Sequence, residues 1–395
     1  MDEAAPCLSH PPAQQAFVET DTALQSFTDL IQESTIVMGR VFSKGYILLY
    51  VSLGLLLGWL ILPDFHNNDH LSTHRRTGDG ILNFFAAFEG YSECNVRASE
   101  LYATPKKDRL GFYEANTFCH DRKHLLRALS EGGRIGFDAP YQPRGCNYRW
   151  FDPEEMCFIL ERVDGLIFVG DDTLQTIYSG FNILLRRDLA LGALDLASMD
   201  KSLQEDCRCN NQFVRSDCQQ HSLLESDRAS QDDHVGSAYF CNRIKHAFLR
   251  VDSAEPASLV VEKFQQLAPK ASRSKYRPIP VIHSLGPSTL SVGDAEASLL
   301  RFVELADESD RNTPMLWIGP TAAGHIDLKD RKGNQEIWDF DRKMTFTAQE
   351  NEVDVLGMWN MTVQATSWDG MRFGEKVAIT QAMMVMNWLS RLESS

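Results

Sequence analysis

Basic residues are scarce in this chain relative to acidic ones. Its 395 residues include 39 Lys and Arg against 54 Asp and Glu, for a formal net charge of −15. Because such a surface repels phosphate backbones, we expect no nucleic-acid partner. The 25 glycines and 15 prolines are too few for a collagen-like chain, and no internal repeat indicates a solenoid. The 43% of hydrophobic residues can fill the core of two average domains or one large α/β domain.

One long run, 46–62, contains no charged residue at all. It reads YILLYVSLGLLLGWLIL and is flanked by Lys44 and Asp64. Its 17 residues would cover about 25 Å as a helix, close to the minimum for crossing a hydrocarbon core. Tyr46 and Trp59 stand near its ends, where amphipathic rings favour the membrane interface. We therefore expect a transmembrane signal-anchor helix at 46–62, rather than a buried core helix or a cleaved signal peptide.

The charges beside this run predict its orientation. Arg40 and Lys44 stand directly before it, whereas the next basic residue after it is Arg75. Nearby positive charge stays in the cytosol, so we expect type II topology with a lumenal C-terminal portion, in a secretory-pathway membrane such as the Golgi. The expected parts are a cytosolic N-terminal tail at 1–45, the anchor at 46–62, a stem at 63–80 and a lumenal domain at 81–395.

Eight of the nine cysteines follow the anchor, which suits an oxidising compartment and up to four disulfides. The candidates are Cys94, Cys119, Cys146, Cys157, Cys207, Cys209, Cys218 and Cys241. Eight cysteines allow 105 pairings, so the sequence assigns none. A metal site at Cys207, Cys209 and Cys218 has no ordinary zinc spacing, and we favour disulfides and expect no metal or cofactor. The sequon at Asn360 lies on the same side and predicts a glycoprotein.

Beyond the stem, strand and helix patterns alternate. Gly165–Val169 is a continuous apolar run typical of a buried parallel strand, and an apolar stripe from Leu174 to Leu185 follows at helical spacing. Further strands are predicted at Ile279–His283, Met315–Ile318 and Val353–Met358, with a closing helix from Val377 to Leu392. This order favours a parallel sheet covered by helices, with function at the carboxyl ends of the strands.

Two short segments carry the candidate chemistry. The first is Val169-Gly-Asp-Asp172, at a turn from strand to helix. Gly170 permits a sharp turn and the helix start favours negative charge, although either aspartate is equally suited to capping the helix. The second is Ser367-Trp-Asp-Gly-Met-Arg372, directly before the closing helix, where an ordinary helix-entry loop is the plain alternative.

Taken together, these segments resemble the PC-esterase group of SGNH hydrolase-like proteins. Cys146-Asn-Tyr-Arg-Trp150, then Cys157, FVGDD and the closing SWDGMRFGEKVAITQAMMVMNWL carry the resemblance, from about Cys146 to Leu389. The group includes plant trichome-birefringence-like polysaccharide O-acetyltransferases and fungal capsule O-acetylation proteins. The resemblance implies an SGNH-hydrolase-like three-layer α/β/α domain behind a single transmembrane helix.

The chain departs from the family pattern at two catalytic positions. The family's first motif is Gly-Asp-Ser; here Gly170 and Asp171 match, and Asp172 stands at the position of the nucleophilic serine. The family's last motif supplies an aspartate and a histidine; here Asp369 matches, with Gly370 after it, and Arg372 stands at the histidine position. A carboxylate forms no ordinary acyl-serine intermediate, and an arginine stays protonated and cannot act as general base. The two changes of charge suggest an Asp172–Arg372 ion pair.

Other residues near strand ends could restore catalysis. Thr173 and Ser284 offer hydroxyls, His283 and His325 offer bases, and Gly319 and Gly324 offer backbone N–H groups to an oxyanion. Each of these is more often an ordinary structural residue.

Three functions are therefore in competition. The first is a catalytically impaired relative, a pseudoenzyme, that binds a glycan or an active transferase partner. The second is an active glycan O-acetyltransferase or acetylesterase with a rearranged centre. The third is a metal-dependent glycosyltransferase, in which adjacent carboxylates would hold a divalent ion and a sugar nucleotide. The third leaves the closing SWDG segment unexplained, and we favour the first.

Overall fold

The computed structural model describes residues 84–103, 117–226, 244–271, 276–288, 290–325 and 333–392. All of them lie in one of the two compact units of the chain, His74–Ser395. The predicted tail, anchor and stem, and Cys241, lie outside the described residues. Within the described part, no helix is both long and apolar enough to cross a membrane.

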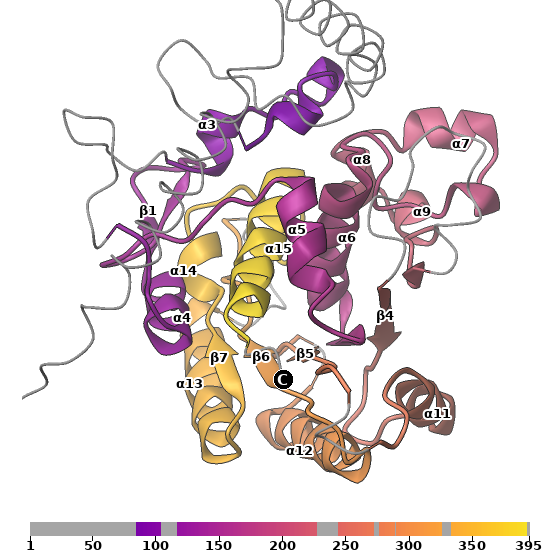
Figure 1. The fold of residues 1–395 in the computed structure, drawn as a ribbon. Helices are drawn as coiled ribbons and strands as arrows, with labels where there is room; N and C mark the ends of the chain where they lie inside the picture. The colour runs from indigo at the N-terminus through magenta and orange to yellow at the C-terminus, as the bar shows by residue number, and fades with distance from the viewer. Residues whose placement is uncertain are drawn as a thin grey trace, which may run out of the picture. The chain divides into compact units, whose positions relative to one another are not determined.

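A five-stranded parallel sheet forms the centre of this unit (Figure 1). The strands are β3 (Gly165–Gly170), β4 (Lys245–Arg250), β5 (Val281–Ser284), β6 (Met315–Ile318) and β7 (Asp354–Leu356). Their order across the sheet is β4-β3-β5-β6-β7, which is a doubly wound order that reverses between β3 and β5. Every residue of β3, β5 and β6 is buried, as continuous apolar runs between two helical layers require.

Helices cover both faces of the sheet, in three layers (Figure 1). The first layer centres on α6 (Asp172–Arg186) and α15 (Glu375–Ser390), which pack against each other and against α4 (Arg122–Ser130) and α5 (Pro153–Leu160). The opposite layer holds α11 (Ser258–Leu267), α12 (Val292–Glu308) and α13 (Asn334–Glu350). Each layer has its own buried apolar cluster, and the two clusters divide the side chains of the sheet between them. The α/β fold with a parallel sheet, predicted from the sequence, is confirmed.

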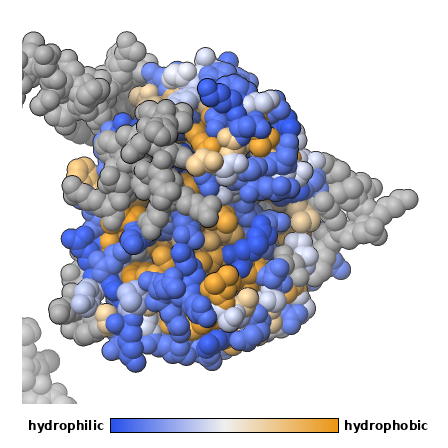
Figure 2. Space-filling model, turned by 90° about the vertical axis from the view of Figure 1, so that its right-hand side faces the viewer, coloured by the Kyte–Doolittle hydropathy of each residue, from blue (hydrophilic) through white to orange (hydrophobic). Residues whose placement is uncertain are grey.

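Smaller elements complete the described part. They are η2 (Ala86–Phe88), η3 (Ser92–Cys94), α3 (Ala98–Leu101), η4 (Leu196–Ser198), α7 (Lys201–Asp206), α8 (Asn211–Val214), α9 (Ser216–Gln219) and α14 (Trp359–Thr362), with an antiparallel pair, β1 (Gly133–Arg134) and β2 (Tyr141–Gln142). The segment from α7 to α9 lies beside the amino-terminal half of α6 (Figure 1). On the face drawn in Figure 2, hydrophilic residues cover most of the surface and apolar residues show in separate areas near its middle.

Disulfides fix the loops that leave the sheet. Cys94 pairs with Cys209, Cys119 with Cys146, and Cys207 with Cys218, and Cys157 is disulfide-bonded as well. The expectation of disulfides rather than a Cys207/Cys209/Cys218 metal site is therefore confirmed for these residues. Three paired bridges in one domain are typical of proteins that fold in an oxidising compartment.

The strands match their predicted positions closely, with one omission. β3 and β6 lie where the apolar runs predict them, while β5 and β7 are shifted or shortened by two residues or fewer at each end. β4 was not predicted, because Lys245, His246 and Arg250 interrupt its apolar pattern. His246 is nevertheless buried, since the Tyr178 hydroxyl lies 2.8 Å from its Nδ1 atom. Burial lowers the pKa of this histidine to about 3, so it stays neutral in the core.

Candidate functional site

A polar pocket of about 210 Å³ opens at the carboxyl ends of β3 and its edge-strand neighbour β4. We call it the polar pocket; its lining comes from four elements. These residues are Asp172, Gln175, Thr176, Ser179, Gln212, Phe213, Ser216, Gln219, Gln220, Ser222, Arg250 and Arg372. The carboxyl ends of the strands are the side of a doubly wound sheet on which ligands bind. Larger hollows of about 690 and 460 Å³ lie by Pro314, at the opposite end of the sheet.

Gly170 and Asp171 build the turn from β3 into α6. A Cβ atom at Gly170 would lie 2.2 Å from the Ser284 carbonyl oxygen, so no side chain fits where β3 and β5 approach. Asp171 caps α6: its Oδ1 atom accepts from Thr173 N at 3.0 Å and its Oδ2 atom from Gly286 N at 2.8 Å. The buried Asp171 carboxylate therefore ties the helix start to the loop after β5, as the capping alternative predicted.

Asp172 points into the polar pocket and pairs with Arg250, not with Arg372. Its Oδ1 atom accepts from Arg250 Nη2 at 2.5 Å, and the same nitrogen donates to Gln175 Oε1 at 2.6 Å. Arg250 is the last residue of β4, and register pairs it with Gly170. The side chain of Asp172 is 61% exposed, so this carboxylate is open to solvent.

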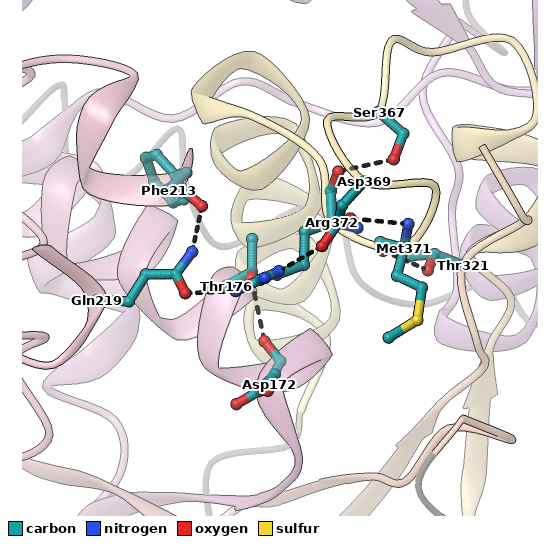
Figure 3. Close-up of polar contacts among 9 residues, drawn as sticks. All are labelled: Asp172, Thr176, Phe213, Gln219, Thr321, Ser367, Asp369, Met371 and Arg372. Carbon is teal, nitrogen blue, oxygen red and sulfur yellow. Dashed lines mark hydrogen bonds and ion pairs between the residues drawn. The ribbon is translucent and has the colours of Figure 1, made fainter. Parts of the chain in front are cut away.

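Arg372 is held within its own loop (Figure 3). Its Nε atom donates to Asp369 Oδ2 at 2.8 Å, and its Nη1 atom donates to Gln219 Oε1. Asp369 Oδ1 accepts from the backbone N–H groups of Met371 and Arg372. Partial burial acts to raise the pKa of Asp369, but the hydrogen bonds from Arg372 and Met371 hold it below its ordinary value.

The expected direct ion pair is thus replaced by two separate pairs. Among the described residues Asp172 pairs with Arg250 and Arg372 pairs with Asp369, although Asp172 and Arg372 line the same pocket. The physical reason is position: the end of β4 brings Arg250 beside the first turn of α6, and Asp369 caps the loop that carries Arg372. The sequence correctly placed Asp369 beside position 372.

The far wall of the polar pocket comes from α8 and α9. Gln219 accepts from Arg372 and donates through Nε2 to the Phe213 carbonyl, so one amide bridges the wall and the loop before α15 (Figure 3). The Cys207–Cys218 bridge closes this segment. The wall otherwise presents hydroxyl and amide groups, including those of Ser216 and Ser222. Such groups both donate and accept hydrogen bonds.

A second pocket, of about 280 Å³, lies on the other side of the start of α6. Its lining is mostly small or apolar and includes Thr173, Pro287, Pro320, Gly370 and Met371. The loop from Gly370 to Arg372 therefore faces both pockets. Of the four rescue residues predicted from the sequence, Thr173 alone lines either pocket.

His283 and Ser284 face away from the candidate chemistry. His283 is fully buried in the layer of α12, with Nε2 3.4 Å from Ser298 Oγ and its ring 5.7 Å from that of Phe302. Burial lowers the pKa of His283 to about 3, so it is neutral. Ser284 is 1% exposed and its carbonyl accepts from Asp171 N. Neither residue can reach a ligand in either pocket.

The remaining rescue groups are also engaged elsewhere. His325 Nε2 lies 3.0 Å from the Val363 carbonyl, and its ring meets that of Phe137 edge to face. Gly319 N donates to the Leu356 carbonyl and Gly324 N to the Gly370 carbonyl, so neither is available to an oxyanion. The predicted rearranged centre is therefore not assembled around these residues.

Two further predictions concern the glycosylation sequon at Asn360 and metal binding. The Asn360 side chain donates to the Ser130 carbonyl at 2.8 Å, and Thr362 of the same sequon is buried. In the part of the chain that the structure describes, no three His, Cys, Asp or Glu side chains are grouped to hold a metal ion. The carboxylate oxygens of Asp171 already accept backbone hydrogen bonds, so the adjacent aspartates do not present a joint ligand set.

Sequence reasoning missed the residues that face Asp172 and Arg372. Arg250 and Gln219 lie 78 and 153 residues away from these partners along the chain. One signal could have found Arg250: it follows the short apolar run Ala247-Phe-Leu249. If that run is a parallel strand, Arg250 lies at the same edge of the sheet as the other strand ends. Gln219 lies outside the two segments that carry the candidate chemistry.

Comparisons with known proteins add no relative. No family model, curated protein or solved structure matches this chain.

Proposed function

We propose that this protein is a membrane-anchored, lumenal relative of the PC-esterase group that binds a glycan in the polar pocket without cleaving or transferring an acyl group. The observation that carries the proposal is the charged and paired side chain at each of positions 172 and 372. The first holds a carboxylate paired with Arg250, and the second holds a guanidinium paired with Asp369. These two positions therefore supply neither a hydroxyl nucleophile nor a neutral base.

The lining of the polar pocket suits a sugar. Gln212, Gln219, Gln220, Ser216 and Ser222 supply amides and hydroxyls, which pair with sugar hydroxyls in either hydrogen-bonding sense. Small-ligand sites combine a concave shape with a few fixed polar groups, and the bridge from Gln219 to Arg372 and Phe213 fixes one of them here.

The compartment and the membrane anchor remain inferences from the sequence. The disulfides of the described residues support a secretory-pathway location. The run 46–62 supports the type II anchor, and the Golgi is the organelle we propose.

Two assays on the full-length chain test the proposal. Hydrolysis of 4-nitrophenyl acetate should equal that of buffer, and Asp172→Ala should change nothing. Turnover above buffer that Asp172→Ala abolishes would contradict the loss of catalysis. On a glycan array the chain should bind, and Ser216→Trp, which fills the pocket, should abolish binding. Ser258→Trp, on the exposed start of α11, is the matched control and should bind normally.

An active O-acetyltransferase or acetylesterase is the second candidate, and one observation favours it. Thr173 lines the second pocket, next to the loop that carries Asp369 and Arg372. Neither candidate base of the described residues serves it, since His283 is buried and His325 contacts Val363. If acyl transfer is measured after all, Thr173→Ala should abolish it in this second candidate and leave it unchanged otherwise.

A further inference from the structure

We propose that the polar pocket selects glycans that carry a carboxylate, such as uronic acids or sialic acid, and that Arg250 and Arg372 bind that carboxylate. This inference rests on the proposed glycan binding and names the chemical class of the ligand. It comes from the arginine donors that the pocket leaves open and from the balance of charge in its lining.

Both guanidinium groups keep unused donors. Arg250 makes its two hydrogen bonds through Nη2 alone, so its Nε and Nη1 atoms have no partner among the described residues. Arg372 uses Nε and Nη1, which leaves Nη2 without a partner in the same part of the chain. The two side chains are 52% and 35% exposed, and both line the pocket. Arginine donors that remain open in a pocket are suited to an anionic oxygen.

The charge of the lining favours a single negative charge on the ligand. Two guanidinium groups and one carboxylate, that of Asp172, face the pocket. A carboxylate would bring one negative charge beside Asp172 and beside Asp369, which pairs with Arg372, whereas a phosphate monoester would bring nearly two. The rest of the protein is acidic, with a net charge of −15, so anionic glycans gain little from its general surface.

The wall formed by α8 and α9 supplies the sugar contacts. Ser216, Gln219 and Gln220 lie on it within the same pocket, and Phe213 gives it an apolar floor. A carboxylated sugar ring presents one anionic edge and several hydroxyls, which matches an arginine side and an amide and hydroxyl side. A neutral sugar would leave the arginine donors without an anionic partner.

The test is an array of neutral, sulfated, uronic-acid and sialic-acid glycans, read with the full-length chain. We expect every bound glycan to carry a carboxylate, and binding to fall as salt is raised. Equal binding of neutral glycans, or binding of sulfated glycans alone, would overturn the carboxylate inference and leave the proposed function standing. No binding to any glycan would instead overturn the proposed function.

Oligogalacturonides and their methyl esters form a matched ligand pair, because the ester removes the charge and keeps the sugar. If the array includes oligogalacturonides among the bound glycans, esterification should weaken binding by about 10-fold or more. For whichever acidic glycan binds, Arg250→Gln and Arg372→Gln should weaken binding by a similar factor. Arg144→Gln is the control, since this 74% exposed arginine pairs with Glu131 outside the pocket. Equal affinity of all three variants would contradict the role of the arginines.

Asp172→Asn separates this inference from a role of Asp172 as a sugar ligand. Removing the carboxylate releases Arg250 and removes repulsion of an anionic ligand, so affinity should rise by about 2- to 5-fold. A carboxylate that accepts hydrogen bonds from sugar hydroxyls would instead lose affinity on the same substitution. A fall in affinity would therefore contradict the proposed arrangement.

Discussion

Arg372 and Asp369 share one loop ahead of α15 and are joined by two hydrogen bonds. A side chain at position 372 that donates to Asp369 would be oriented in the same way as a triad base. Position 172 lies across the same pocket, on the first turn of α6. Positions 172 and 372 therefore face the same pocket.

Restoring both side chains should produce measurable esterase activity. Asp172→Ser with Arg372→His supplies a nucleophile, a base and the orienting Asp369. We expect aryl acetate turnover about 10²-fold above either single variant, the lower end for general-base assistance, because Gly286, Gly319 and Gly324 donate elsewhere. The single variants should match buffer. A folded double variant without turnover would mean that the pocket lacks the geometry for acyl transfer.

Glu375, the first residue of α15, predicts a pH dependence of stability. It is 2% exposed, and neither carboxyl oxygen has a hydrogen-bond partner among the described residues. Burial raises its pKa from 4.5 to about 8, with Asp188 adding to the rise and Lys376 opposing it. The folded state therefore binds a proton that the unfolded state releases, and stability falls as pH rises from about 4.5 to 8.

Glu375→Gln should remove this loss, because glutamine keeps the shape and carries no charge. Thermal melts of the full-length chain should show a higher Tm for the variant at pH 8 and nearly the same Tm at pH 5. Glu304→Gln, at a 65% exposed carboxylate, is the control and should shift neither. A variant that melts lower than the wild type at pH 8 would show that Glu375 is ionised and paired in the native state.

At the scale of elements, the segment from Cys207 to Ser222, which holds α8 and α9, forms a wall of the polar pocket that does not belong to the sheet. The Cys207–Cys218 bridge closes an 11-residue separation within it, whereas Cys119–Cys146 closes 27 residues elsewhere. Stabilisation by a disulfide grows with the length of the loop that it closes. The two bridges should therefore differ in their effect on stability and on ligand binding.

Cys207→Ser with Cys218→Ser should lower the free energy of unfolding by about 2–3 kcal/mol and also weaken glycan binding, because Gln219 and Ser216 lose their support. Cys119→Ser with Cys146→Ser should cost at least as much stability and leave affinity unchanged. Denaturant unfolding and glycan titration of both double variants test this. Equal loss of binding in both would contradict the role of this wall.

The helices and strands also show what the sequence could predict. β3 and β6 were predicted because a buried parallel strand is apolar on both faces. β4 was missed because its Lys245, His246 and Arg250 break that pattern, and its burial depends on tertiary contacts such as the one from Tyr178 to His246. Local pattern thus predicted β3, β5, β6 and the edge strand β7, and missed the other edge strand, β4.

At the scale of the whole molecule, the site depends on contacts between distant segments. The cap at Asp171 and the pair of Asp369 with Arg372 are local contacts, and the sequence offered a helix cap at Asp171 or Asp172 as one alternative. The partners Arg250 and Gln219 come from β4 and α9, which only the order of the strands and the folded wall bring to positions 172 and 372. The opposite charges of Asp172 and Arg372 suggested an ion pair between them. In the structure Asp172 pairs with Arg250 and Arg372 pairs with Asp369 instead.

A single NMR experiment tests the central claim, that this pocket binds a glycan and leaves its ester intact. The full-length chain is mixed with an O-acetylated oligosaccharide from a glycan that it binds. Saturation transfer reports contact with the sugar, and the acetyl resonances report turnover in the same sample. We predict saturation transfer to the sugar protons that Ser216→Trp abolishes, with acetyl signals constant over time. Loss of the acetyl signals at a rate that Ser216→Trp abolishes would contradict the account.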